Sequence, residues 1–170
     1  GRIDIDFALN PSSDLPDLPE VGIMFKMGGT YDHLTWYGKG PHESYWDRQL
    51  GAKLGLYAGK VRDQFVPYLR PQECGNKTEV REARITDAAG NGFLIKGRPK
   101  FEWNVLPYTW EELESHDHVY KLPVSDKSVV RINAHQMGVG GDDSWGARPH
   151  PEYTLPANRV YRLRVTLEML

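Results

Sequence analysis

Residues 78–96 read TEVREARITDAAGNGFLIK, and this stretch sets the fold class expected for the 170-residue chain. Two strand-like runs, Thr78 to Thr86 and Gly92 to Lys96, flank the turn-forming segment DAAGNG. Asn and Gly tolerate the positive φ angles of tight turns, so the stretch predicts an antiparallel β-hairpin.

The strand pattern continues on both sides of this hairpin. Ile3, Ile5, Phe7 and Leu9 alternate with polar residues, which is the period of a half-buried strand. Residues 1–20 therefore combine an opening strand with a Pro-rich connector. Further strands are predicted at Val21 to Met27, Leu34 to Tyr37, Lys53 to Tyr57, Phe101 to Leu106, Val129 to Ala134 and Val160 to Leu167.

One short helix interrupts the strand pattern. Thr109 is placed to cap a helix that runs through Leu113, and Glu112 occupies the reciprocal capping-box position. Many brief strands with Gly and Pro turns predict an all-β antiparallel sandwich or barrel, with residues 1–170 forming one domain.

Composition excludes several classes of partner. The 21 basic and 23 acidic residues give a net charge of -2, without a basic run to follow a phosphate backbone, so we expect no nucleic-acid partner. No apolar run reaches the length of a membrane span. Cys74 is the only cysteine and does not distinguish the cytoplasm from the periplasm. The start, GRID, resembles neither a signal peptide nor natural initiation, so we expect a domain cut from a longer protein.

Residues 137–146, MGVGGDDSWG, are the most informative segment for function. Glycines and adjacent carboxylates predict a shaped surface loop, and Trp145 within it offers a flat apolar face for a sugar ring, an aromatic ligand or a partner protein. Composition alone favours the alternative that Trp145 folds back and fastens the loop to the core. The residues expected to shape the loop are Gly140, Gly141, Asp142, Asp143 and Ser144.

Five carboxylates are candidates for the acid, base or nucleophile of a glycosidase, namely Glu43, Asp47, Glu73, Asp142 and Asp143. None of them lies in a motif that requires catalysis. Asp47 is followed by Arg48, which indicates a structural charge network. Asp142 and Asp143 are placed to accept backbone N–H groups within the glycine loop.

Other reactive residue patterns are incomplete. If their segment is a strand, His116 and His118 share one face of it, where two imidazoles are a candidate metal pair. A third ligand is not evident nearby, so structural roles are favoured. Ser144 follows two acids and lies outside a Gly-x-Ser-x-Gly motif, which argues against a serine nucleophile. The segment from Phe65 to Thr78 suits either a cleft lining or a buried crossover connection.

Four segments in register resemble a known family. They are WYGKGPHESY at 36–45, YLRPQECGN at 68–76, MGVGGDDSWG at 137–146 and HPEY at 150–153. In this order and spacing they resemble the C-terminal, small-chain domain of the large bacterial β-galactosidases of glycoside hydrolase family 2. The resemblance extends from about Leu18 to the C-terminus. Two positions depart from the common pattern, with Cys74 in place of Asn and Trp46 in place of Pro.

The resemblance implies a β-supersandwich similar to galactose mutarotase. It implies that the catalytic glutamates, Mg²⁺ and Na⁺ belong to a barrel elsewhere in a homo-oligomeric parent enzyme, so we expect neither a catalytic residue nor a metal site in this chain. The loop at 137–146 would enter the mouth of the barrel, where Trp145 would form a platform for the aglycone side of a β-galactoside such as lactose.

Two alternatives remain open. In the first alternative, the chain is a carbohydrate-binding or assembly module. In the second it is a free-standing mutarotase-like epimerase, whose acid/base pair would be His42 with Glu43 or His116 with Glu73. Nothing in the spacing of these residues favours the epimerase.

Overall fold

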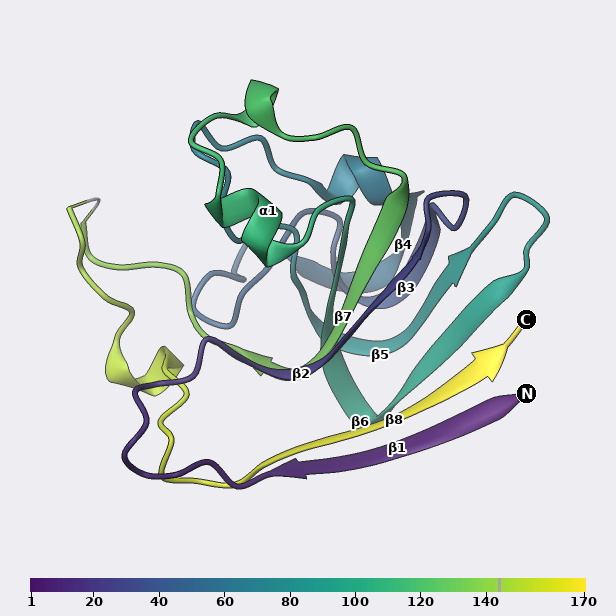
Figure 1. Cartoon of the computed structure of the whole chain (residues 1–170). Coiled ribbons are helices and arrows are strands. Elements are labelled where there is room, and N and C mark those ends of the chain that lie inside the picture. Colours follow the sequence, from purple (N-terminus) through teal and green to yellow (C-terminus); the bar gives the residue numbers. More distant parts are fainter. Residues whose placement is uncertain (144) are drawn as a thin grey trace.

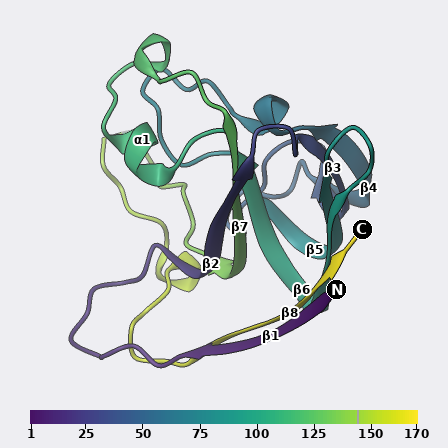
Figure 2. The same ribbon diagram turned by 45° about the vertical axis from the view of Figure 1, so that its right-hand side comes forward.

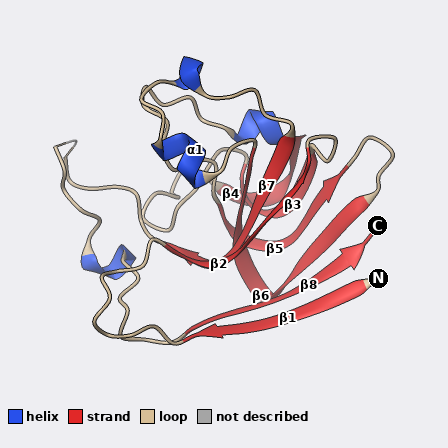
Figure 3. Cartoon of the chain, in the orientation of Figure 1, coloured by secondary structure: helices blue, strands red, loops and turns tan. Residues whose placement is uncertain are grey.

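Antiparallel strands account for most of the regular structure in the computed structural model, which describes residues 1–143 and 145–170 (Figure 3). The strands of this described part are β1 (Arg2–Leu9), β2 (Glu20–Gly28), β3 (His33–Gly40), β4 (Lys53–Lys60), β5 (Lys77–Thr86), β6 (Gly92–Leu106), β7 (Lys127–Gln136) and β8 (Tyr161–Met169). The helix α1 (Trp110–Glu114) is accompanied by 3₁₀ turns at Val61–Gln64, Val119–Lys121 and Pro151–Tyr153. The predicted all-β class is confirmed.

The sheet divides at β6. Its main path has the order β1-β8-β6-β5-β3-β4, and β7 pairs with both β6 and β2. The first half of β6 pairs with β8 over Phe93–Gly97, whereas the second half pairs with β7 over Glu102–Leu106. Figures 1 and 2 show the β1–β8 pair and the β2–β7 pair leaving β6 in different directions.

The division explains one difference from the sequence prediction. We predicted separate strands at 92–96 and 101–106, but both belong to β6 because β5 pairs with each of them. Between the two paired regions the register shifts, so that Val80 faces Phe101 and Glu82 faces Lys96. The residues between them form a bulge, which lets the opposite edge of β6 change its neighbour from β8 to β7.

The main core lies between the curved parts of the sheet. Leu34 and Trp36 of β3 pack in one cluster with Ile132 of β7 and Val165 of β8. Trp103, in the second half of β6, is 1% exposed and lies in the same cluster. The sheet therefore folds over its own inner face, as in a sandwich. The closer likeness to galactose mutarotase stays a prediction.

The hairpin and the helix form as predicted. Asp87 Oδ1 accepts the backbone N–H groups of Ala89 and Asn91, each at 2.9 Å, and so closes the turn between β5 and β6. At α1, Thr109 Oγ1 accepts from Glu112 N at 3.3 Å, while Glu112 Oε2 accepts from Thr109 N at 2.8 Å. Among the residues that the structure describes, no helix is long and apolar enough to cross a membrane.

The long connection from β7 to β8 carries the glycine-rich segment. Its base is tied to the connector after β1, because Met137 N donates to Pro19 O at 2.8 Å. In Figures 1 and 2 this connection and α1 lie on the same side of β7. The ends of β2 and β7 thus bring residues from distant parts of the sequence to the foot of the loop.

Candidate functional site

The glycine loop, defined as residues 137–150, is anchored at its base by Asp47. The carboxylate Oδ2 of Asp47 accepts from Gly140 N at 2.7 Å, although 93 residues separate them in the sequence. A Cβ atom at Gly138 would lie 2.8 Å from Asp47 Cγ, so this close approach requires glycine. We interpreted Asp47 with Arg48 as one charge network, but Arg48 pairs with Glu43 and Asp47 holds the loop.

Trp46 provides a second anchor that sequence reasoning missed. Its indole Nε1 donates to Tyr153 O at 3.1 Å, and the same carbonyl accepts from Gly138 N at 2.8 Å. The Trp46 ring also packs edge-on against the Tyr153 ring, with centroids 5.9 Å apart. The aromatic residue at this position therefore ties the base of the glycine loop to the segment that follows it.

Carboxylates also contact the upper part of the loop. Asp143 Oδ1 accepts from Trp145 N at 2.7 Å and from Ala147 N at 3.3 Å. Asp142 Oδ1 lies 2.8 Å from His150 Nε2, and this hydrogen bond raises the pKa of His150. These are contacts that loop-shaping residues need, and the functional roles predicted for them stay predictions.

The glycines of the loop differ in the space around them. A Cβ at Gly141 would lie 2.3 Å from the carbonyl oxygen of Ala147, whereas a Cβ at Gly140 would lie 3.2 Å from Asp47 Oδ2. The backbone of the loop thus folds closely onto itself at Gly141. Ser144, which was also predicted to shape the loop, lies outside the described residues.

Trp145 projects away from the domain. Its exposed fraction is 93%, in contrast to 3% for the core residue Trp36. The alternative in which Trp145 fastens the loop to the core is therefore wrong for this structure. The indole is available to a ligand or partner, while the peptide that carries it is fixed through Asp143.

Glu43 is surrounded by donors from its own and a neighbouring segment. It accepts from Gly75 N at 2.7 Å, from the Tyr68 hydroxyl and from the Arg48 guanidinium. These contacts connect the turn after β3 with the segment before β5. A carboxylate used in this way holds two loops together, which is a structural role.

Glu73 lies at the centre of a charged cluster, defined here as the Arg131 cluster. Its carboxylate accepts two bonds from Arg131 Nη2, at 2.9 and 2.8 Å, and one from the Tyr45 hydroxyl at 2.9 Å. Arg131 Nη1 also donates to Glu20 Oε2 at 3.0 Å. Burial raises the pKa of Glu73 and Arg131 opposes the rise, while the two carboxylates hold the pKa of Arg131 above its ordinary value.

The segment from Phe65 to Thr78 combines the two roles that we considered for it. Cys74 is fully buried, and burial raises the pKa of its thiol to about 12, so it acts as a small core side chain. By contrast, Gln72 and Glu73 line a cavity. The crossover is therefore buried at one end and borders a cleft at the other.

Glu102 and His135 form a pair that sequence reasoning also missed. Glu102 Oε1 lies 4.0 Å from His135 Nδ1, and Glu102 Oε2 accepts from Asn76 Nδ2 at 2.9 Å. Burial raises the pKa of Glu102 to about 7 and lowers the pKa of His135. Only strand pairing between β6 and β7 brings these residues together, so their spacing in the sequence offered no signal.

His116 and His118, considered earlier as paired residues, each contact other neighbours. His116 and His118 do not share a strand face, because they lie between α1 and a 3₁₀ turn. His116 Nδ1 lies 2.6 Å from Glu112 O, and His118 Nδ1 lies 3.2 Å from Asp117 Oδ1. Within the described part of the chain, no hydrogen bond or ion pair joins His42 to Glu43 or His116 to Glu73, and no three metal-binding side chains cluster.

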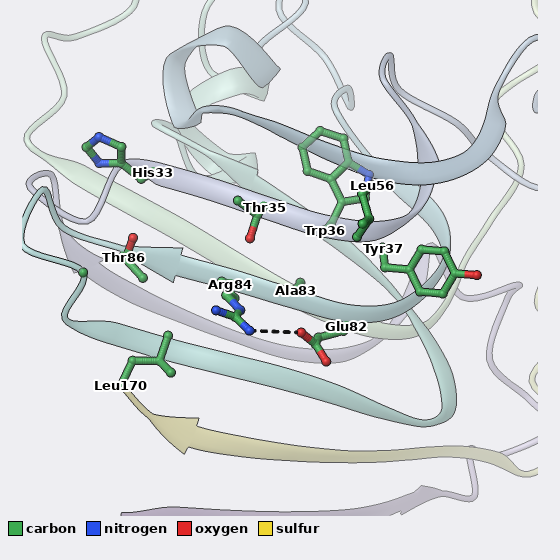
Figure 4. Close-up of a pocket in the computed structure, with 11 residues that line it drawn as sticks. His33, Thr35, Trp36, Tyr37, Leu56, Glu82, Ala83, Arg84, Thr86 and Leu170 are labelled. Atoms are coloured by element: carbon green, nitrogen blue, oxygen red, sulfur yellow. Dashed lines mark hydrogen bonds and ion pairs between the residues drawn. The ribbon is translucent and has the colours of Figure 1, made fainter.

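A separate hollow of about 500 Å³ crosses β3 and β5 (Figure 4). Tyr37 and Leu56 border it, and Glu82 and Arg84 pair at 3.4 Å along β5. Leu56 is 83% exposed. The predicted site residues do not line this hollow, which places it apart from the glycine loop.

Sequence comparison with known proteins identifies the family of this chain. The family model described as "Beta galactosidase small chain" matches residues 1–167. A β-galactosidase of Priestia megaterium is 59% identical over 170 residues, covering 100% of this chain and 16% of the relative. Those of Halalkalibacterium halodurans and Streptococcus thermophilus are 45% and 40% identical, over 85% and 100% of this chain and 14% and 17% of the relatives. The chain therefore spans a small part of these relatives and belongs to the β-galactosidase small chain family.

Proposed function

We propose that this chain is a non-catalytic part of a retaining β-galactosidase that hydrolyses terminal β-D-galactosides such as lactose. The relatives described above are named β-galactosidases, and the chain covers only 16% of the Priestia megaterium enzyme. In the complete enzyme, a glutamate of another domain would displace the leaving alcohol from the galactosyl carbon. Water would then hydrolyse the galactosyl-enzyme ester. This chain would position the leaving group or the acceptor during both steps.

The exposed indole of Trp145 is the observation that carries this proposal. An apolar ring that is 93% exposed gains no burial energy from its own domain. Its backbone is nevertheless held by Asp143, and the loop beneath it is held by Asp47. A projecting indole on a held backbone suits the C–H face of a sugar, so Trp145 would form the platform on the aglycone side of the substrate.

The remainder of the β-galactosidase is then the partner of the glycine loop. The catalytic barrel would supply the reacting glutamates together with Mg²⁺ and Na⁺, in a homo-oligomeric enzyme. Closing the loop against that barrel would exclude water from one side of the Trp145 ring and strengthen its contact with the sugar.

Steady-state kinetics of the complete enzyme test the platform. Trp145→Ala should raise KM for lactose by about tenfold, because an aromatic platform of this kind contributes on the order of 1.4 kcal/mol. Trp145→Phe should restore part of the affinity. Tyr120→Ala is the matched control, because Tyr120 is also well exposed but lies on a different turn. Unchanged lactose kinetics in a folded Trp145→Ala enzyme would overturn the proposal.

Assays of the 170-residue chain separate the other functions. Turnover of a chromogenic β-galactoside would contradict the proposed lack of catalysis. Faster anomerisation of α-D-galactose, followed by polarimetry, would support the epimerase instead. A Trp145→Ala enzyme that loses its assembly while its active protomers keep normal KM would favour the assembly module.

A further inference from the structure

A groove lies beneath the glycine loop, apart from the exposed face of Trp145. One cavity of about 720 Å³ is bordered by α1, the ends of β2 and β7, and the loop residues Val139 and Pro149. A second cavity of about 420 Å³ extends toward Arg70. Both are lined by Gln72, Glu73, Trp110 and Glu114, so they form one continuous groove. Its size is sufficient for an extended small ligand.

Trp110 provides an aromatic wall for this groove. It is the first residue of α1 and is 52% exposed, whereas Leu113 in the next turn is buried against Leu106. The capping box at Thr109 and this buried leucine fix the short helix. The indole is thereby presented to the groove on a rigid support, as sugar-stacking aromatic residues require.

The remaining lining combines apolar residues, such as Met137, Val139 and Pro149, with charged groups that are formally acidic in balance. Glu20, Glu73 and Glu114 contribute three carboxylates, against which Arg131 and Arg70 contribute two cations. Arg131 is already engaged by Glu20 and Glu73. An anionic ligand would meet these carboxylates without a free buried cation to offset them, so the groove favours a neutral ligand that donates hydrogen bonds.

Gln136 supplies an unused acceptor beside the groove. The residue is 6% exposed and lines the larger cavity, and its Oε1 atom is buried without a hydrogen-bond partner among the described residues. A buried amide oxygen left in this state costs free energy. A ligand hydroxyl that reaches Gln136 would satisfy it.

We propose that the groove binds a neutral oligosaccharide, with one sugar ring stacked on Trp110 and one hydroxyl donating to Gln136. The groove meets the glycine loop at Val139 and Pro149, so the bound sugar would be a remote unit of a substrate or acceptor whose nearer unit lies on Trp145. The choice of galactosides as ligands rests on the proposed function. The presence of a saccharide groove rests on the aromatic wall, the acidic groups within a mixed lining and the unpaired amide oxygen.

Direct binding to the 170-residue chain tests the groove without catalysis. Isothermal titration with the trisaccharide galactosyl-lactose should detect binding that Trp110→Ala weakens by about tenfold and Gln136→Leu weakens by a smaller factor. Tyr120→Ala should retain the full affinity. Circular dichroism checks that each variant is folded, and Trp110→Phe provides a second variant that should keep part of the affinity.

Two results of the titration would overturn the proposal. One is no detectable binding of the trisaccharide by the folded chain. The other is binding that Trp110→Ala and Gln136→Leu both leave unchanged. A groove that instead takes a lysine-rich peptide, with an affinity that falls steeply as NaCl is added, would also overturn it, because neutral sugars bind almost independently of salt.

Kinetics of the complete enzyme separate this inference from the proposed function. Trp110→Ala should raise KM for galactosyl-lactose and leave KM for lactose unchanged, whereas Trp145→Ala should raise both. An effect of Trp145→Ala alone would contradict the proposed saccharide groove and support the proposed platform. If Trp110→Ala raises KM for the trisaccharide and Trp145→Ala changes neither KM, the platform proposal is contradicted and the groove proposal is supported.

Discussion

The Arg131 cluster and the glycine loop use acidic residues in opposite ways. In the cluster, both oxygens of Glu73 meet donors, and the Arg131 side chain is only 8% exposed. In the loop, Asp142 and Asp143 bind neighbouring groups, yet the Asp142 side chain is 83% exposed and Trp145 is 93% exposed. The cluster satisfies its charges within the domain, whereas the loop leaves its largest apolar side chain without an internal partner.

This difference separates residues that stabilise the domain from residues that are available to bind a ligand or partner. Arg131 joins carboxylates from the segments at 20 and 73 and so fixes the floor of the groove. The loop needs only its backbone to be held, which Asp47 and Asp143 accomplish. Substitutions in the cluster should therefore reduce stability, and substitutions at the loop tip should reduce function with little change in stability.

The largest effect is expected at the cluster. Arg131→Met leaves Glu73 and Glu20 without their shared cation and should lower the free energy of unfolding by about 3 kcal/mol, toward the low end for buried pairs because the carboxylates retain some exposure. Urea denaturation measures the loss. Arg164→Met, which removes a surface pair with Asp6, should cost less than about 1 kcal/mol. Similar losses in both variants would break the distinction between cluster and surface.

The second effect concerns the buried carboxylate Glu102 and depends on pH. Burial raises the pKa of Glu102 from 4.5 to about 7. Its contribution to stability is therefore complete below pH 4.5 and is lost as the pH rises through about 7. At pH 8, Glu102→Gln should be more stable than the unsubstituted chain by up to about 3 kcal/mol.

Urea denaturation between pH 5 and 8 checks this linkage, because that range spans the raised pKa of Glu102, about 7. The advantage of Glu102→Gln should shrink as the pH falls toward 5, because the native carboxyl is then protonated in the folded chain as well. Glu82→Gln, at a more exposed carboxylate on β5, serves as the control. An advantage that does not change with pH would show that Glu102 does not titrate in this range.

A smaller effect is expected within the glycine loop. Gly141→Ala places a Cβ 2.3 Å from the Ala147 carbonyl oxygen, so the loop must open and should lose about 1 kcal/mol. Amide hydrogen exchange at Ala147, whose N–H binds Asp143, reports the opening. Gly51→Ala is the matched control, because its Cβ would have no neighbour within 4 Å. Equal exchange in both variants would argue against close packing at Gly141.

The smallest effect on stability is expected at Trp145. Because its ring is almost fully exposed, Trp145→Ala should change the free energy of unfolding by less than about 0.5 kcal/mol. Thermal or urea denaturation of the 170-residue chain measures this change. A loss above 1.5 kcal/mol, on the order of a buried apolar side chain, would mean that the indole packs on the domain and would remove the contrast with the Arg131 cluster.

Local patterns predicted much of the fold. Alternation at Ile3 to Leu9 predicted β1, and the DAAGNG segment predicted the hairpin that Asp87 closes. Thr109 and Glu112 predicted the start of α1. The bulge in β6 was missed, because Gly97 and Pro99 are typical turn residues in the sequence. Only the pairing of β5 with both halves of β6 shows that the strand continues.

The candidate site was predicted less completely. The glycine loop and its Trp145 were found from composition, and the platform role of Trp145 was assigned through the family resemblance. Asp47 was assigned to the wrong partner, since its hydrogen bond to Gly140 spans 93 residues. Trp46 and the pair Glu102–His135 were missed for the same reason. Contacts between distant segments depend on strand order, which residue spacing does not specify.

The sequence by itself determined most of the strands, the hairpin, the capped helix and the position of the glycine loop. These features depend on side-chain periodicity and on backbone preferences over a few residues, which are local properties. Only the tertiary structure decided that Arg131 pairs with Glu20 and Glu73, that Trp110 faces a groove, and that Trp145 stays exposed. Burial, ion pairing and pKa depend on which segments the sheet brings together, and that is a property of the whole fold.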